Sequence, residues 1–209
     1  MVELYGSITP STYMITIMLE EIGVRYTVFP VTKENSESLE LELSKFAPHH
    51  HFPIILDREK PQSPPVAIFE PSAILMYLAE KSGQFMPKML AERFEVLQWL
   101  LFENSKIGPV FGNNKHFTLH ATESVPYAVK RFSSETKRLC SIIDKQLGEN
   151  QFLAGEYSIA DIAAYAWIKD YERLGIHPDE IPHICDWLDR LNKRKATQAG
   201  WESLTNLKE

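Results

Sequence analysis

The sequence predicts an α+β fold in two parts, a small mixed domain with the element order βαβαββα followed by an all-helical domain. Short runs rich in β-branched and aromatic residues occur within the first 70 residues, where they alternate with segments of helical periodicity. Beyond a break at residues 82–87, the periodic segments have helical spacing. We therefore expect residues 1–83 to form the mixed domain and residues 89–209 to form the helical domain.

The first half of the mixed domain has the pattern of a βαβ unit. Residues 2–5 form a short strand, and Ser11 is placed to cap a helix whose apolar residues recur at helical spacing until Gly23 stops it. Residues 26–31 form a second strand, which is parallel to the first because a helix lies between them. The acidic segment 33–46 predicts a further, weakly amphipathic helix.

The second half of the mixed domain has the pattern of a hairpin followed by a helix. Residues 54–57 and 66–69 are apolar runs joined by a short proline-rich turn, so the two strands are antiparallel. A helix then begins near Pro71, because proline is favoured at the first helical position, where its missing N–H leaves no helical bond unmade.

The second half of the chain is predicted to be helical. Ser158 and Asp161 have the spacing of a capping box, with Tyr157 and Ile162 at the positions of a hydrophobic staple. The remaining helices follow from apolar residues at helical spacing. We expect helices over residues 90–107, 125–147, 159–170 and 184–194, with an interruption after the first at Gly108-Pro109.

Charge and cysteine usage exclude several classes of protein. The net charge of −6, without a basic block, argues against nucleic acid or an anionic membrane as the main partner. The first residues lack a secretory signal pattern and no apolar run has membrane-spanning length, so we expect a cytoplasmic protein. Cys140 and Cys185 have neither CxxC nor metal-ligand spacing, and we interpret both as core thiols.

The dipeptide Phe52-Pro53, directly before an apolar strand, is a candidate ligand cradle. Proline cannot donate a hydrogen bond to a neighbouring strand, so this position indicates either an edge strand or a cis peptide bond. An unpaired Phe52 backbone can hold an extended peptide by strand addition. The alternative is a loop, punctuated by proline, before a core strand.

Several motifs in order give the chain a resemblance to the cytosolic glutathione transferases over nearly its whole length. The first set is Leu4-Tyr5, Thr9-Pro10-Ser11, Phe52-Pro53, residues 69–74, residues 77–80 and Ser158-Ile159-Ala160-Asp161. A second set is similar to the nu class, which contains bacterial disulfide-bond reductases that use glutathione. It comprises residues 97–100, Gly108-Pro109, Gly112-Asn113, His116-Phe117, Pro126-Tyr127-Ala128 and Arg131.

This resemblance implies a thioredoxin-like domain, a helical domain, a homodimer and glutathione as co-substrate without a metal. An enzyme of this kind stabilises the thiolate of glutathione, and the N–H groups and dipole at a helix start favour a negative sulfur. Thr9 and Ser11 lie at such a start, and we expect a hydroxyl of one of them to contact the thiolate. Ser11 as a plain helix cap is the alternative. Tyr5 has a similar position in some classes, but we interpret it as a core tyrosine.

The peptide-binding residues also follow from the resemblance. The Phe52 backbone, next to Pro53, pairs with the cysteinyl part of glutathione, and Glu70 faces the γ-glutamyl amine. The family usually has serine after this acid, whereas this chain has Pro71, which lacks both a hydroxyl and an N–H. Ser72 compensates only if the turn shifts, because one helical position is roughly 100° of rotation. The alternative is that Glu70-Pro71-Ser72 only starts a helix.

His51 is a second departure from the family pattern. Many relatives have lysine here, which meets the glycyl carboxylate, whereas a neutral histidine donates one hydrogen bond and makes affinity depend on pH. Together with His49 and His50 it forms a run of three histidines, which a metal site or a solvated loop would explain. We favour the solvated loop, because no carboxylate or distant partner is evident.

The second substrate is expected to meet the helical domain. Arg131 is placed to meet an anionic group such as a second glutathione, and no cysteine is available for redox chemistry at the first site. The alternative is that most of the aromatic candidates belong to the domain core and that Arg131 is an exposed surface charge. The candidates are Phe111, Asn113, Tyr127 and Arg131, with Trp99, Asn114, His116 and Phe117 as further ones. The sequence thus predicts a glutathione transferase or glutathione-dependent disulfide-bond reductase. The alternative is a binding or regulatory protein of the same fold, favoured by Pro71 and His51.

Overall fold

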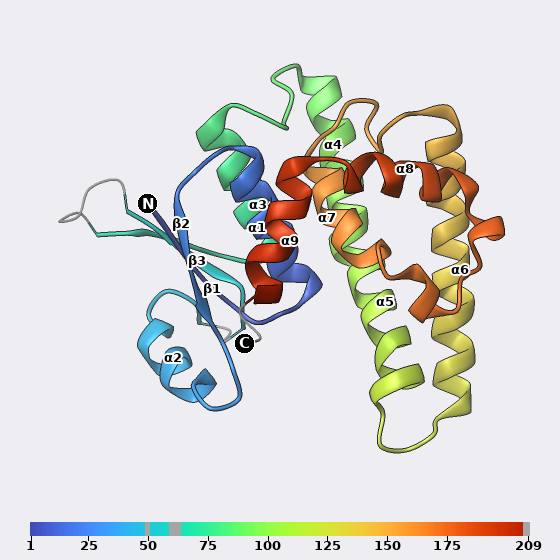
Figure 1. Ribbon diagram of the computed structural model, residues 1–209, viewed down its shortest axis with the longest axis horizontal. Helices are drawn as coiled ribbons and strands as arrows, with labels where there is room; N and C mark the ends of the chain where they lie inside the picture. Colours follow the sequence, from blue (N-terminus) through green and yellow to red (C-terminus); the bar gives the residue numbers. More distant parts are fainter. Residues whose placement is uncertain (49–50, 59–63, 207–209) are drawn as a thin grey trace. The chain divides into compact units, whose positions relative to one another are not determined.

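The computed structural model describes residues 1–48, 51–58 and 64–206 and divides the chain into two compact units (Figure 1). The first unit combines Met1–Gln84 with Arg194–Glu209, and the second is Phe85–Lys193. The sequence assigned residues 194–209 to the helical domain. The contacts of residues 194–206 place this segment instead in the first unit.

The first unit is built on a four-stranded sheet with the order β2-β1-β3-β4. The strands are β1 (Val2–Gly6), β2 (Tyr26–Pro30), β3 (Ile54–Asp57) and β4 (Val66–Phe69). Strand β1 pairs with β2 in parallel and with β3 in antiparallel orientation, and β3 pairs with β4 in antiparallel orientation, as predicted. Because β3 lies inside the sheet, an edge position for Phe52-Pro53 is wrong. The alternative holds: the Phe52-Pro53 peptide bond is cis.

The sheet of the first unit is accompanied by α1 (Pro10–Glu21), α2 (Ser36–Leu43) and α3 (Pro71–Ser82). The N-cap of helix α1 is Thr9, two residues before the predicted cap at Ser11, and Pro10 lies in the first turn. The predicted cap at Ser11 is therefore wrong. Proline is preorganised for the first helical position, so Pro10 fixes the helix start and places Ser11 inside it.

A fourth helix, α9 (Lys195–Thr205), packs on α1, and the sequence analysis missed it. Thr16 Oγ1 donates a hydrogen bond to the Gly200 carbonyl at 2.7 Å, and the rings of Tyr13 and Trp201 stack with centroids 3.8 Å apart. A Cβ on Gly200 would lie 2.6 Å from the backbone of Ile17. Glycine is therefore what lets the two helices approach this closely.

The second unit is helical, and its long first run continues where the sequence predicted an interruption at Gly108-Pro109. The Gly108 N–H donates to the Glu103 carbonyl in a π-helical turn, and Pro109 lies in the first turn of the next helix, where no N–H is required. The elements are α4 (Leu90–Phe102), η1 (Glu103–Ile107), α5 (Gly108–Lys115), η2 (His116–His120), α6 (Pro126–Glu149), α7 (Ile159–Ile168), η3 (Tyr171–Leu174), η4 (Pro178–Glu180) and α8 (Pro182–Asn192).

The predicted capping box at the start of α7 is confirmed. The Ser158 hydroxyl accepts a hydrogen bond from the Ala160 N–H, and Asp161 Oδ2 accepts one from the Ser158 N–H at 3.1 Å. Asp161 Oδ1 also accepts from the Leu153 N–H and from Trp187 Nε1, both at 3.0 Å. Burial raises the pKa of Asp161 to about 6, against the opposing effect of these donors. This carboxyl group therefore joins α7, α8 and the loop before α7.

The residues that the structure describes include no helix long and apolar enough to cross a membrane.

Candidate functional site

The strand register brings the predicted binding segments to one edge of the sheet. Tyr5 near the end of β1 pairs with Ile54 at the start of β3, and Ile54 pairs with Phe69 at the end of β4. Residues that follow β1 and β4 and residues that precede β3 must therefore lie together. These are residues 7–11, Phe52-Pro53 and residues 70–72.

At this edge, the start of α1 presents two hydroxyl groups in different environments. Thr9 Oγ1 lies 3.2 Å from the buried Thr12 Oγ1 and donates weakly to the Ser7 carbonyl at 3.5 Å. The half-buried Ser11 hydroxyl has no hydrogen-bond partner among the described residues. Gly6 makes this arrangement possible, because a Cβ there would lie 2.7 Å from the Thr12 side chain.

Tyr5 belongs to the core, in agreement with the sequence analysis. Its ring stacks on Phe29 with centroids 4.7 Å apart, and its hydroxyl donates to Glu3 at 3.4 Å. Burial, followed by the negative charge of Glu3, raises the pKa of Tyr5 to about 12. Its hydroxyl is thus committed to a neighbouring carboxylate.

A pocket of about 390 Å³ lies beside the Phe52 backbone. It is lined by Ser7, Val31, Thr32, Lys33, Ser36, Glu40, His51 and Phe52. Of these, the sequence analysis named only His51 and Phe52. Since β2 runs parallel to β1, residues after both strands must reach the same edge, and this signal would have pointed to residues 31–36.

The backbone of Glu70 is strained. It precedes α3 with φ 68° and ψ 119°, a left-handed conformation that is rare for a residue with a side chain. The first helical bond of α3 runs from the Ile74 N–H to the Glu70 carbonyl, which leaves the N–H groups of Ser72 and Ala73 without helical partners. Strain of this kind persists where the surroundings hold it, often at ligand sites.

Pro71 and Ser72 modify this helix start. Pro71 occupies the first turn and offers no N–H. The Ser72 hydroxyl is fully buried and has no hydrogen-bond partner among the described residues. The Ser72 side chain therefore does not face an open site, and its backbone N–H is the group it can offer to an anion.

The second-substrate candidates separate into buried and exposed residues of the helical unit. Phe111 is only 1% exposed and belongs to the core, which contradicts its predicted role as a lining residue. Asn114 is also buried, where it donates to Thr136 Oγ1 at 3.1 Å and to the Leu174 carbonyl at 3.2 Å. It joins α5, α6 and η3 instead of facing solvent.

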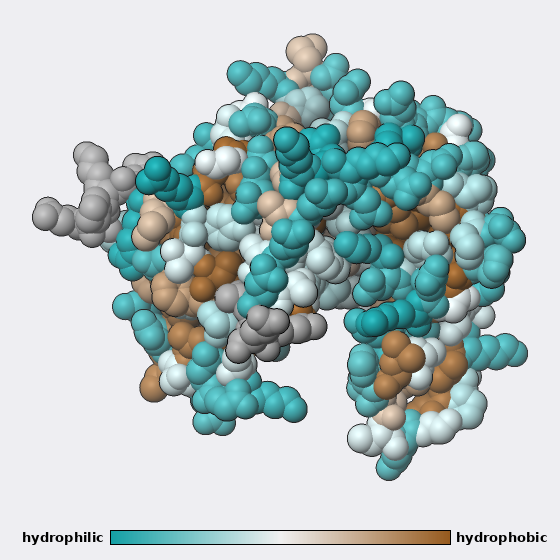
Figure 2. All heavy atoms as spheres, viewed as in Figure 1, coloured by the Kyte–Doolittle hydropathy of each residue, from teal (hydrophilic) through white to brown (hydrophobic). Residues whose placement is uncertain are grey.

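The other candidates lie at the surface. Tyr127 is 74% exposed, and the exposed Arg131 lies one turn later on α6, on the same face. The exposed Asn113 donates its amide to the Pro109 carbonyl at 2.7 Å. Figure 2 shows apolar side chains at the free end of α5 and α6, where Leu119 and Val125 are exposed. This end of the helical unit combines apolar surface with a cation.

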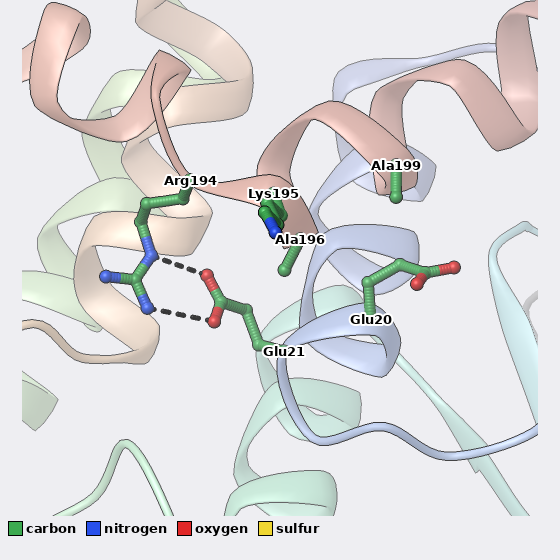
Figure 3. Close-up of a pocket in the computed structure, with 6 residues that line it drawn as sticks. All are labelled: Glu20, Glu21, Arg194, Lys195, Ala196 and Ala199. Atoms are coloured by element: carbon green, nitrogen blue, oxygen red, sulfur yellow. Dashed lines mark hydrogen bonds and ion pairs between the residues drawn. The ribbon is translucent and has the colours of Figure 1, made fainter.

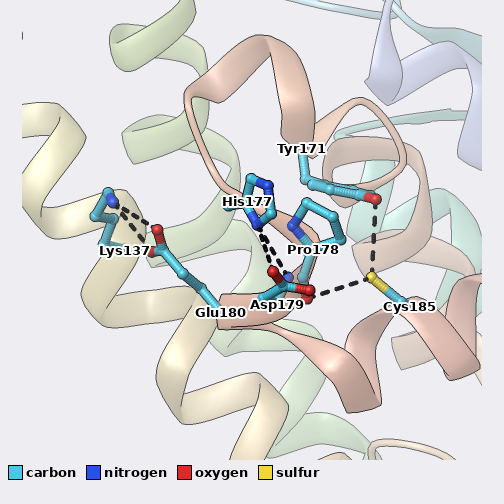
Figure 4. Close-up of polar contacts among 7 residues, drawn as sticks. All are labelled: Lys137, Tyr171, His177, Pro178, Asp179, Glu180 and Cys185. Carbon is cyan, nitrogen blue, oxygen red and sulfur yellow. Dashed lines mark hydrogen bonds and ion pairs between the residues drawn. The ribbon is translucent and has the colours of Figure 1, made fainter.

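Both cysteines lie in the helical unit, where Cys140 is a core thiol, as predicted, whereas Cys185 is only partly buried and does not belong to the core. Cys140 is buried, and burial raises the pKa of its thiol to about 12. Cys185, in the helical unit, donates from its Sγ to the Tyr171 hydroxyl at 3.7 Å (Figure 4). The described residues contain no group of three or more metal-ligating side chains, and His49 and His50 lie outside them.

A second pocket, of about 460 Å³, lies where α1 ends and α9 begins (Figure 3). Arg194 donates two hydrogen bonds to Glu21, at 2.7 and 2.9 Å, across this pocket. Glu20, also in its wall, accepts a hydrogen bond from the Tyr26 hydroxyl at 2.7 Å. Glu20, Glu21 and Arg194 therefore already have hydrogen-bond partners within the protein. We interpret this pocket as part of the packing contact between α1 and α9.

Comparison with known proteins identifies the family. The glutathione S-transferase C-terminal domain family matches residues 114–195. The disulfide-bond oxidoreductase YfcG of Escherichia coli is 36% identical over 199 residues, which cover 94% of this chain and 93% of that protein. The chain belongs to the glutathione transferase family.

Solved members of this family have the same fold. A glutathione transferase from Pseudomonas putida, solved with one glutathione disulfide bound per subunit, has a TM-score of 0.88 and 36% identity, covering 96% of this chain and 90% of that one. A member from Pseudomonas fluorescens, solved with two glutathione molecules bound, has a TM-score of 0.88 and 37% identity, covering 96% and 92%. The predicted family and the two-part fold are therefore confirmed.

Proposed function

We propose that the protein is a glutathione-dependent enzyme that binds glutathione at the sheet edge of its first unit and uses the thiolate to reduce a small disulfide or to attack an electrophile. The observation that carries the proposal is the register that joins the α1 start, the Phe52 backbone and the α3 start at one edge. The relatives named above, a disulfide-bond oxidoreductase and two transferases with glutathione or its disulfide, support this choice of ligand.

Glutathione binding is assigned to backbone groups and one acid. The Phe52 N–H and C=O, which have no partner among the described residues, pair with the cysteinyl residue of the peptide. The Glu70 carboxylate meets the γ-glutamyl ammonium group. The Ser72 and Ala73 N–H groups, at the positive end of α3, donate to the γ-glutamyl carboxylate. These two N–H groups replace the N–H that Pro71 lacks.

The thiolate is assigned to the start of α1. The Ser11 hydroxyl is the first candidate donor, because it has no other partner among the described residues. Thr9 can act as well, since Thr12 can donate to Thr9 Oγ1 and the Thr9 proton can turn to the sulfur from its long 3.5 Å contact with the Ser7 carbonyl. Donors to the anionic form lower the pKa of a thiol, which increases the thiolate fraction at neutral pH.

Disulfide reduction then needs two glutathione molecules and no protein cysteine. The first thiolate attacks one substrate sulfur, so that a mixed disulfide forms, the substrate S–S bond breaks and the leaving sulfur takes up a proton. A second glutathione thiolate attacks the glutathione sulfur of the mixed disulfide and releases the second substrate thiol. Two glutathione molecules are oxidised to one glutathione disulfide, and the substrate gains two electrons. Arg131 and Tyr127 on α6 and Asn113 on α5 are the proposed contacts for the second molecule.

We also propose a homodimer and a cytoplasmic location. Helix α4 carries an apolar stripe formed by Leu90, Phe94, Leu97 and Leu101, and the first, second and fourth are 71%, 55% and 56% exposed. Residues at this spacing share one helix face, which a second copy of the chain would cover. Both cysteines are free thiols, as is usual in a reducing compartment.

The proposal is tested by calorimetric titration of the protein with reduced and oxidised glutathione, combined with an assay of disulfide reduction. We expect both ligands to bind in the micromolar to low-millimolar range. Ser11→Ala and Thr9→Ala should each lower kcat/KM, with Ser11→Ala lowering it about tenfold or more, roughly the effect of one donor to the reacting anion. Arg131→Gln should weaken the binding of oxidised glutathione more than the binding of reduced glutathione.

Two results would overturn this assignment. Equal and full activity of Ser11→Ala and Thr9→Ala would remove the thiolate site from the start of α1. No binding of either ligand at several millimolar would mean that Pro71 and His51 have closed the site to glutathione, which leaves the binding or regulatory protein as the better account.

A further inference from the structure

The pocket beside Phe52 contains a cation that the family motifs did not indicate. Lys33 lines this pocket together with His51 and Phe52. Among the described residues it has neither an ion pair nor a hydrogen bond through its side chain. Its ammonium group is therefore available to an anionic ligand in the pocket.

The loop that carries Lys33 is held in place by its neighbours. The Thr32 N–H donates to Asn35 Oδ1 at 2.8 Å, and the Asn35 amide donates to the Pro30 carbonyl at 2.9 Å. The Val31 N–H donates to the Gly6 carbonyl at 3.0 Å, which ties the loop to the end of β1. Lys33 is thus presented from a fixed backbone, so less ordering is required when a ligand binds.

The sheet order places Lys33 on the side of the cradle away from Glu70. The segment after β4 begins with Glu70, the segment before β3 contains Phe52, and the segment after β2 contains Lys33, with β1 between the last two. Three strand spacings separate β4 from β2, roughly 14 Å. An extended tripeptide spans about 10–11 Å, and the lysine side chain covers the remainder.

We propose that Lys33 binds the glycyl carboxylate of glutathione, in place of the lysine that position 51 lacks. This inference rests on the proposed function. A peptide whose γ-glutamyl end lies at the start of α3 and whose cysteine pairs with Phe52 must direct its other end toward the pocket. Lys33 supplies there a cationic donor, which a neutral imidazole is not.

Glu40 lies in the same pocket, and its negative charge should have the opposite effect on glutathione affinity to the positive charge of Lys33. Its carboxylate repels a bound carboxylate, so removing its charge should strengthen binding while removing that of Lys33 weakens it. Both effects should vanish for a ligand whose glycyl end is uncharged. The ethyl ester of glutathione at the glycyl carboxylate is such a ligand.

The experiment is calorimetric titration of the full chain at pH 8 with glutathione and with this ester. The wild type should bind glutathione about tenfold more tightly than the ester, roughly the effect of one charge-assisted contact. Lys33→Gln should bind both ligands with the affinity that the wild type has for the ester. Glu40→Gln should bind glutathione severalfold more tightly than the wild type, and the exposed Lys88→Gln, which makes the same charge change outside the pocket, should behave as the wild type.

The outcomes distinguish the role of Lys33 from the proposed glutathione-dependent function. If the wild type binds glutathione and Lys33→Gln keeps the same preference over the ester, the role of Lys33 is overturned while the proposed function stands. If the wild type binds neither ligand, both are overturned. Lys33 is exposed, so thermal melting of the variant checks that a loss of affinity does not reflect unfolding.

Discussion

Glu103 is a carboxyl group that folding removes almost completely from water. It is 3% exposed in the π-helical turn η1, and its Oε1 lies 3.3 Å from the position that a Cβ on Gly108 would take. Burial raises the pKa of Glu103 to about 8. A glutamate in an unfolded chain has a pKa of about 4.3. Between these two values the folded protein keeps a proton that the unfolded chain has released.

This ionisation should weaken the protein as the pH rises. Proton binding to the folded state alone makes the free energy of unfolding fall with pH from about 4.3 upward, until Glu103 ionises near its folded pKa of about 8. Glu103→Gln mimics the protonated form, so we expect it to raise the free energy of unfolding at pH 8 by about 2 kcal/mol or more. The gain should shrink at pH 5. Urea unfolding followed by tryptophan fluorescence at both pH values measures it.

The matched control is Glu92→Gln, an exposed acid on α4. It should leave the difference between the two pH values as in the wild type. Identical pH dependence of Glu103→Gln and the wild type would show that the buried carboxyl is not the source of the effect.

At the scale of single elements, α1 is held by two glycines on different partners. Gly6 lets the end of β1 approach Thr12, and Gly200 lets α9 rest on the backbone at Ile17. Both contacts leave less than 3 Å for an added carbon atom. The helix whose start is proposed to hold the thiolate is therefore positioned by its fit to neighbouring backbone, in addition to the burial of its apolar side chains.

Two glycine substitutions test this view of α1. Gly200→Ala puts a methyl group 2.6 Å from backbone atoms of Ile17, which cannot move as a side chain can, so we expect a loss of about 2 kcal/mol or more in stability. Gly112→Ala, also inside a helix, meets Trp167 at an ordinary 3.6 Å and should be neutral or stabilising by up to about 1 kcal/mol. Thermal melting compares the two variants. Equal effects would mean that helix propensity, and not the contact with α1, decides the outcome.

The helices and strands show which parts of the fold could be predicted from the sequence. The strands and the capping box at Ser158 were predictable, because alternation, punctuation and hydrogen-bonding spacing are local properties. The cap of α1 was misplaced because Thr9 and Ser11 both fit the pattern, and only Pro10 decides between them. Lys33 escaped notice because a charged residue in an acidic segment resembles solvated surface until the partner strand is known.

The location of longer segments was harder to predict. The burial of Phe111 depends on which face of α5 the other helices cover. The position of α9 depends on the contact of Gly200 with α1, where its hydrogen-bond partner Thr16 lies 184 residues earlier. Hydrophobic periodicity identifies an apolar helix face but does not identify the element that packs on it. Such long-range packing is specified by shape complementarity, which a single sequence does not display.

At the scale of the whole molecule, the apolar stripe on α4 provides the test of assembly. Leu90, Phe94 and Leu101 expose more than half of their surface on one helix face, which a solitary chain would leave in water. We expect the wild type to sediment as a dimer and Phe94→Glu, which places a charge at the centre of the stripe, to sediment as a monomer. Glu95→Gln, a polar change at the next residue, is the control. A dimeric Phe94→Glu would place the interface elsewhere.

The packing of α9 on α1 also has a consequence for the order in which the protein is made. The first unit is discontinuous in the chain, because residues 194–205 complete it only after the whole helical unit has been synthesised. On the ribosome, the surface of α1 around Ile17 and the ring of Tyr13 therefore remain uncovered until residues 195–205 have been synthesised. The first unit, although most of its residues precede the helical unit in the sequence, becomes complete only after the helical unit has been synthesised.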